Sequence, residues 1–219
     1  MPSTLTQLNE EVAPKRPRGR PRKTSVERDD GNRRPALLQA AAILFRRQGY
    51  AATTTRDIAA AAGMQSGSPF YHFKSKEALL YAVMEEGMRS AQQRQMAALD
   101  KQKDTSCTPQ EQLRSLIQVH FEVLLGPGND FVPVMLYEAR SLQLRQRTHL
   151  AQLIAEYEAL WIPVLQALHT KGQLKAPVGL ARLLIFGAMN WSVQWFDTRK
   201  SATLQDLTDA ALSMFIKEM

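Results

Sequence analysis

Closely spaced helix signals in residues 33–80 constrain the fold more than any other feature of the chain. Apolar residues recur at three- and four-residue intervals over about 34–48, which predicts an amphipathic helix that ends at Gly49. Thr54, followed three residues later by Asp57, predicts a capped second helix. Two short helices therefore follow each other within some thirty residues, a spacing typical of small helical DNA-binding domains.

A third helix is predicted directly after the second. Gly63 provides a turn, and the next helix begins near Gln65 or Ser66, with Pro69 tolerated in its first turn. Ser75 then predicts the N-cap of a fourth helix. A helix, a glycine turn and a helix with small, aromatic and basic side chains form a helix-turn-helix unit, so the pattern places the function on DNA.

Residues 33–80 resemble the DNA-binding domain of the tetracycline-repressor (TetR) family of bacterial one-component regulators. The residues that carry this resemblance are Leu38, Ala41, Phe45, Gly49, Tyr50, Thr54, Asp57, Ile58, Ala59, Ala62, Gly63, Gly67, Ser68, Tyr71, Phe73, Ser75, Lys76, Glu77, Ala78 and Leu79. Pro69 departs from the family, which usually has a branched aliphatic residue there. This departure affects the base preference rather than the fold.

The resemblance also implies which side chains meet DNA. Those expected to face base edges in the major groove are Gln65, Ser66, Ser68, Pro69 and Phe70. Those expected to hold phosphates are Tyr71, His72 and Lys76, with Thr54 or Thr55 at the start of the second helix.

A basic arm precedes this domain. Residues 1–32 lack apolar periodicity, so we expect them to be disordered in isolation. Six cations fall within residues 15–23, and Arg18-Gly19-Arg20-Pro21 resembles an AT-hook. We expect Arg18 and Arg20 to enter a narrow A·T-rich minor groove, where the negative potential is strongest. The alternative is a solvated basic tail that acts as a nonspecific anchor.

The distribution of charge supports a DNA-binding N-terminal part. Residues 1–98 hold 16 Lys or Arg and nine Asp or Glu, whereas residues 99–219 hold 12 of each. The whole positive excess therefore lies where phosphates would be neutralised. If the excess only kept the protein soluble, the C-terminal half would not need to be neutral.

Residues 81–219 are expected to form a second, all-helical domain for effector binding and dimerisation, which makes the fold class all-α. The predicted helices start after Thr108 and end near Leu125, run from Asp130 to about Leu144, cover 147–170 with a kink at Pro163, cover 178–197 after Pro177, and start after Thr203. The last two carry more apolar surface than a monomer can hide, and in the family they resemble such helices pair across a twofold axis. We therefore expect a homodimer, with an ordinary intrachain core as the alternative.

The resemblance further implies a small-molecule effector pocket between the middle helices. The candidate ligand-binding residues are Phe121, Met135, Tyr137, Arg140, Trp161, Phe186, Met189, Asn190, Trp191 and Trp195. Among them Asn190 needs a polar partner if it is buried. Residues 187–196 resemble the corresponding helix of family members that sense acyl-CoA or fatty acids, which favours that class over an aromatic or multidrug-like effector.

Several classes of protein find no support in the sequence. There is no nucleophile elbow, phosphate-binding glycine loop or zincin pair, so we expect no enzyme, no cofactor and no metal. His72, His120, His149 and His169 are scattered. A single cysteine, Cys107, and the absence of an apolar leader fit the cytoplasm. Residues 178–196 are apolar but contain Arg182 and Asn190, so we expect a buried helix rather than a membrane span.

The prediction is thus a ligand-responsive repressor that binds a pseudopalindromic operator in double-stranded DNA as a dimer. Effector binding would favour a state whose two heads no longer match the half-sites, with the fourth helix as the lever. The rivals are an architectural binder of A·T-rich DNA that responds to no ligand, and an enzyme or carrier with a vestigial DNA head.

Overall fold

The computed structural model describes residues 30–64, 72–102 and 106–217, with side chains from residue 33 onward. Asn32–Met219 form one compact unit. The described helices are α1 (Asp30–Ala52), α2 (Thr55–Ala61), α4 (Lys76–Asp100), α5 (Pro109–Leu125), α6 (Phe131–Glu138), α7 (Leu144–Ala159), α8 (Ile162–Thr170), α9 (Val178–Trp191) and α10 (Leu204–Phe215). Within the described residues the only strand-like pairing is a single bridge between Leu174 and Ile216, so the all-α prediction is confirmed.

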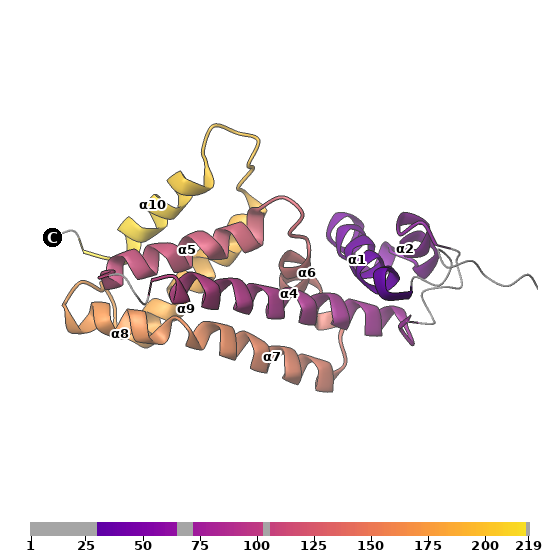
Figure 1. The fold of residues 1–219 in the computed structure, drawn as a ribbon, viewed down its shortest axis with the longest axis horizontal. Coiled ribbons are helices and arrows are strands. Elements are labelled where there is room, and N and C mark those ends of the chain that lie inside the picture. Colours follow the sequence, from indigo (N-terminus) through magenta and orange to yellow (C-terminus); the bar gives the residue numbers. More distant parts are fainter. Residues whose placement is uncertain (1–29, 65–71, 103–105, 218–219) are drawn as a thin grey trace, which may run out of the picture. The chain divides into compact units, whose positions relative to one another are not determined.

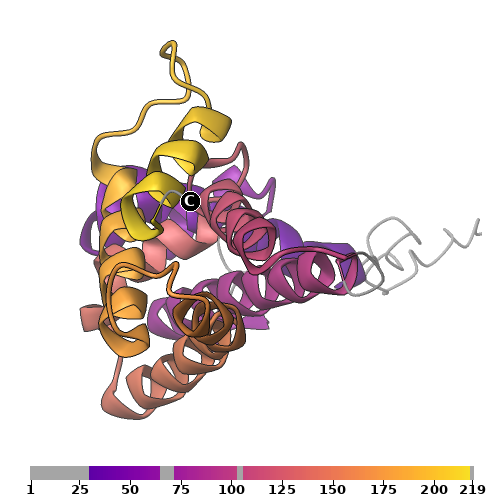
Figure 2. The ribbon, with the colours of Figure 1, turned by 90° about the vertical axis from the view of Figure 1, so that its left-hand side faces the viewer.

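The long helix α4 is the centre of the packing. It contacts α5, α6 and α7, and α5 in turn packs against α8 and α10. Figure 1 shows α4 running between α5 and α7. Seen from the end in Figure 2, α10 lies on one side of the α4–α5 pair and α7 with α8 on the other. The helices of the C-terminal part therefore pack around α4 and α5.

Local capping signals place the helix starts where the sequence predicts them. Thr54 accepts a hydrogen bond from the backbone N–H of Asp57, whose carboxylate accepts one from the N–H of Thr54 in return. The same reciprocal pair occurs at the starts of α5 and α10. Ser75 caps α4 through the N–H of Ala78. Each cap satisfies backbone donors that a helix start would otherwise leave unpaired.

Glycines lie at the predicted ends of the first two helices, although α1 resumes after a kink at Gly49 and runs to Ala52. Gly49 has φ 80°, a left-handed value that breaks the helical path of α1, and Gly63 has φ 67°. The predicted stripe of α1 is buried in the core, with Leu37, Ala41 and Phe45 almost fully covered. The apolar periodicity and the glycines together thus determine the first two helices.

Three of the predicted helix boundaries in the C-terminal domain are wrong. The helix from Asp130 ends at Glu138, followed by a 3-10 turn over Ala139–Ser141, because Leu142 is extended and buried in the core. The predicted single helix over 147–170 is two helices, and Pro163 lies in the first turn of α8 instead of kinking a longer helix. The predicted 178–197 helix ends at Trp191, before a 3-10 turn over Ser192–Gln194.

No helix within the described part of the chain combines the length and the apolar character that crossing a bilayer requires. α9, the candidate singled out in the sequence, has 14 residues.

Candidate DNA interface and effector site

Most of the residues predicted to contact DNA, including all those predicted to read bases and the phosphate-binding Tyr71, lie outside the described structure. This applies to Arg18, Arg20, Gln65, Ser66, Ser68, Pro69, Phe70 and Tyr71. Four of the predicted DNA contacts can be placed. Thr54 is exposed at the N-cap of α2, Thr55 begins that helix, His72 is half-buried, and Lys76 begins α4.

Lys76 has a structural role that the sequence did not suggest. Its ammonium donates hydrogen bonds to the carbonyls of Tyr50 (2.9 Å) and Thr53 (2.8 Å) and lies 4.3 Å from the centre of the Tyr50 ring. A cation at the end of α1 satisfies carbonyls that lack helical partners. The ammonium thus joins α4 to the end of α1. Its predicted phosphate contact stays a prediction, for which one of its three donors is left.

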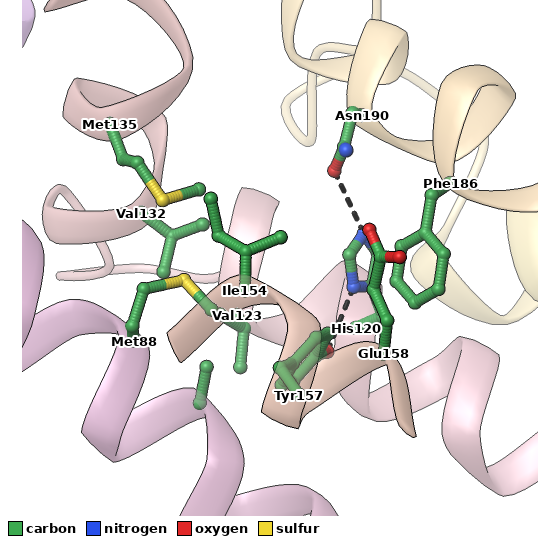
Figure 3. Close-up of a pocket in the computed structure, with 11 residues that line it drawn as sticks. Met88, His120, Val123, Val132, Met135, Ile154, Tyr157, Glu158, Phe186 and Asn190 are labelled. Carbon is green, nitrogen blue, oxygen red and sulfur yellow. Dashed lines mark hydrogen bonds between the residues drawn. The ribbon is translucent and has the colours of Figure 1, made fainter. Parts of the chain in front are cut away.

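A small cavity of about 30 Å³ lies among α4, α5, α6, α7 and α9, and its volume is about 360 Å³ when the part open to solvent is counted. Figure 3 shows its two unlike ends. The apolar end is lined by Met88, Val123, Val132, Met135 and Ile154. The other end carries His120, Tyr157, Glu158, Phe186 and Asn190. Apolar walls with a few polar groups are typical of small-molecule sites.

A chain of hydrogen bonds crosses the polar end. The side-chain nitrogen of Gln95 donates to the carbonyl of Leu116 (2.9 Å) and to the hydroxyl of Tyr157 (2.8 Å). That hydroxyl lies 2.9 Å from Nδ1 of His120, and Nε2 of His120 lies 3.1 Å from Oδ1 of Asn190. The buried side chains of Gln95, Tyr157 and His120 are thereby linked to one another, and Asn190 ends the chain.

Burial keeps these groups uncharged. Desolvation lowers the pKa of His120 from 6.5 to about 4, although the hydrogen bond with Asn190 opposes the shift. Desolvation likewise raises the pKa of Tyr157, and its phenol stays protonated. The imidazole is therefore neutral at pH 7 and carries one N–H.

One ionised side chain lines the cavity. Glu158 forms an ion pair with Arg182 of α9, and both side chains are mostly covered, with 20% and 29% of their surfaces exposed. Because the pair joins α7 to α9, the positive charge of Arg182 is compensated at the wall of the cavity.

Three of the predicted ligand-binding residues do line the cavity: Met135, Phe186 and Asn190. Phe121, Trp161 and Met189 are buried but do not line it. Trp161 packs behind the wall, with its ring centre 4.9 Å from that of Phe186. For these three, core packing accounts for the burial.

The remaining candidates do not line this cavity, and a role for them in ligand binding stays a prediction. Tyr137 is 46% exposed because it follows Met135 by two residues, which is about 200° around the helix. Arg140 is exposed on the turn after α6. Trp191 and Trp195 are exposed at 64% and 56%.

Sequence reasoning missed His120 and Tyr157, which were not assigned to the pocket. A signal did exist for His120, since it follows Leu113, Leu116 and Ile117 on the buried stripe of α5. A titratable side chain in such a buried stripe needs hydrogen-bond partners. Buried titratable groups with such partners are often found at binding sites. Tyr157 offered no comparable signal.

Helix α6 joins the cavity to the DNA-binding head. Asp130, before its first turn, forms an ion pair with Arg46 of α1 at 2.9 Å. Glu138, at its end, accepts a hydrogen bond from the backbone N–H of Tyr50 at 2.9 Å. Between these two contacts, Val132 and Met135 line the cavity. A shift of α6 would therefore change both the cavity and the contacts with α1 of the DNA-binding head.

Helix α9 presents an apolar stripe to solvent in the single chain. The exposed members are Leu180, Leu183, Leu184, Gly187, Ala188 and Trp191, which recur at three- and four-residue intervals. Exposed large apolar side chains in one contiguous row mark an interaction surface.

No cluster of three or more metal-binding side chains occurs within the described ranges.

Comparisons with known proteins agree on one family. Residues 37–83 match the family of bacterial regulatory proteins, tetR family, and residues 106–219 match the tetracyclin repressor-like C-terminal domain. The HTH-type transcriptional repressor KstR2 of Mycolicibacterium smegmatis is 32% identical over 170 residues, which cover 75% of this chain and 80% of KstR2. The fatty acid metabolism regulator protein of Bacillus subtilis is 26% identical over 183 residues, 82% of this chain and 92% of that protein.

Among solved structures, that of the superantigen PfiT is similar to this chain. It is 37% identical, with a TM-score of 0.71, and the match covers 87% of this chain and 100% of PfiT.

Proposed function

The chain belongs to the tetR family of bacterial regulatory proteins, and from this premise we propose that it is a cytoplasmic, ligand-responsive transcriptional repressor. It is a DNA-binding regulator with an N-terminal helix-turn-helix domain, and its partners are duplex DNA, a second copy of itself and a small molecule. The observation that carries the proposal is the continuity of α4 and α6 between the DNA-binding head and the cavity.

A homodimer presents two reading heads to a pseudopalindromic operator. Half-sites on one face of duplex DNA lie about 34 Å apart, one helical turn. The exposed stripe of α9 and the exposed Met214 of α10 supply an apolar surface for the twofold contact. Removing this surface from water is favourable in proportion to its area.

The DNA contact would use both grooves. The segment after Gly63 would read the major groove, and the phosphate contacts would include Thr54, Thr55 and His72. Arg18 and Arg20 of the basic arm would enter the adjacent minor groove. The excess of positive charge on residues 1–98 supports this arrangement.

The effector would occupy the cavity among α4, α5, α6, α7 and α9. Its methionine, valine and isoleucine walls suit an aliphatic chain, which favours the acyl-CoA or fatty-acid class. The similarity to a protein named as a fatty acid metabolism regulator supports that class.

Release from DNA would follow from a shift of α4 and α6. Met88 lies on α4, about 18 Å along the helix from Lys76, which is bonded to the end of α1. A ligand that wedges these helices apart favours a head geometry that no longer fits DNA. Moving the population from 99% bound-competent to 99% released requires a preference of about 10⁴-fold for the released state.

A mobility-shift titration tests the proposal. DNA from upstream of the gene for this protein is bound by the full chain, and acyl-CoAs and aromatic acids are then added. We expect a discrete shifted protein–DNA complex that dissociates when acyl-CoAs are added. Uniform coating of any A·T-rich duplex, or a complex that effectors tighten, would contradict it.

A further inference from the structure

The direction of each hydrogen bond at the polar end of the cavity can be assigned. The carbonyl of Leu116 only accepts, so the Gln95 atom next to it is the amide nitrogen. That nitrogen also donates to the hydroxyl of Tyr157, and the hydroxyl proton is satisfied when it is donated to Nδ1 of His120. A neutral imidazole that accepts at Nδ1 carries its proton at Nε2.

The chain of donors ends at Asn190. Since Nε2 of His120 donates, its partner is the amide oxygen of Asn190, as Figure 3 shows. The amide nitrogen of Asn190 therefore keeps two N–H donors, and within the described residues this nitrogen donates no hydrogen bond. Asn190 lines the cavity, so these donors are available to a ligand.

The charges at the same end argue against an anion. Glu158 is the one ionised residue among those that line the cavity, and its partner Arg182 is already paired. His120 is buried and uncharged at neutral pH. A carboxylate placed here would lose water without gaining a free cation, and it would lie near a second carboxylate.

We propose that the cavity selects an apolar acyl group whose carbonyl is uncharged, held by the side-chain N–H of Asn190, and that it rejects the corresponding free carboxylate. This inference rests on the proposed function and narrows its effector class from fatty acids and acyl-CoAs to the thioester form or another neutral carbonyl. The hydrocarbon chain would lie against Met88, Val132 and Ile154.

Titration calorimetry on the full chain at pH 7.5 tests the selectivity. The probes are octanoyl-CoA, the octanoyl thioester of N-acetylcysteamine, 2-decanone and sodium octanoate. We expect the thioesters to bind at least about tenfold more tightly than octanoate. Equal binding of 2-decanone and the small thioester would assign recognition to the carbonyl alone, and weaker binding of 2-decanone would assign part of it to the thioester group. Octanoate binding as tightly as the thioesters would overturn the inference.

Two variants locate the selectivity. Asn190→Leu removes the donors and should weaken the small thioester about tenfold without strengthening octanoate. Glu158→Gln releases Arg182 for an anion and should strengthen octanoate about tenfold. Glu156→Gln is the matched control, because Glu156 is exposed on the same helix and does not line the cavity. Unchanged ratios in both test variants would overturn the assignment.

The mobility-shift assay separates the two levels of failure. If octanoate releases DNA as readily as the thioesters, the effector-controlled repressor stands and only the selectivity is wrong. If no probe binds the protein or releases it from DNA, the acyl effector class and this inference both fail.

Discussion

Individual buried residues decide how this protein responds to acid. His120 is 4% exposed and is hydrogen-bonded to Tyr157 and Asn190. Loss of these bonds would leave buried polar groups unpaired, which is destabilising. Its folded-state pKa of about 4 lies below the ordinary 6.5, so the unfolded chain binds a proton that the folded chain does not. Its neutral form therefore contributes to stability above pH 6.5.

We predict that this contribution disappears as the pH falls from 6.5 to about 4. The shift corresponds to about 3 kcal/mol of unfolding free energy. His120→Gln should be less stable than the parent at pH 7 and should lose about 3 kcal/mol less on acidification. Urea denaturation at pH 7.5 and pH 4.5 measures both values. Parallel losses in the two proteins would contradict the assignment.

Among the elements, α6 occupies the position through which the two sites meet. It is only eight residues long, yet its two ends are held to α1 while its middle lines the cavity. A short helix packed in this way moves as a rigid body, so an effector that displaces Met135 also displaces Glu138. Helix α4 provides the second connection through Lys76.

We predict that Glu138→Ala weakens the coupling between effector and DNA. The lost hydrogen bond to Tyr50 is worth about 1 kcal/mol, so the factor by which effector lowers DNA affinity should fall about fivefold. Fluorescence anisotropy with and without octanoyl-CoA measures this factor. Glu156→Ala, which makes the same charge change at an exposed site of α7, should leave it unchanged. An equal effect of both variants would indicate charge alone.

At the scale of the whole molecule, the exposed α9 stripe makes the single chain incomplete. Leu183 and Leu184 are each 59% exposed in the middle of the row, flanked by Gly187 and Ala188, which let a second helix approach closely. Under the proposed dimer, a second copy of the chain would cover this row with an identical row, as a twofold contact requires.

We predict that Leu184→Glu yields a folded monomer with at least tenfold weaker operator binding, because buried carboxylates would face each other across the twofold axis. Leu144→Glu is the matched control, since Leu144 is 73% exposed but lies at the start of α7. Sedimentation velocity, circular dichroism and anisotropy report mass, fold and affinity. A dimeric Leu184→Glu protein would place the interface elsewhere.

The basic arm gives a further prediction for the whole chain. Deleting residues 1–23 removes six cations, so operator binding should weaken and the slope of log affinity against log salt should become shallower. Anisotropy titrations at salt concentrations from about 50 to about 200 mM measure the slope. An unchanged slope would show that the arm does not contact DNA.

The predictions from sequence succeeded where the signal was local. Thr54, Thr108 and Thr203 cap their helices because the partner carboxylate lies three residues ahead. They failed where the outcome depended on remote packing. The burial of Leu142 ends the segment after α6, which the sequence had predicted to continue as a helix to about Leu144.

The sequence by itself determined the all-α class, the family and most helix starts, because caps, glycine turns and apolar periods act over a few neighbouring residues. Only the tertiary structure decided the composition of the effector site. Met88, His120, Tyr157 and Asn190 come from four helices spread over a hundred residues, and only their packing brings them together. Packing also leaves the amide N–H donors of Asn190 without a partner among the described residues and pairs Glu158 with Arg182 at the same end of the cavity. Both features depend on several helices together and on no single segment.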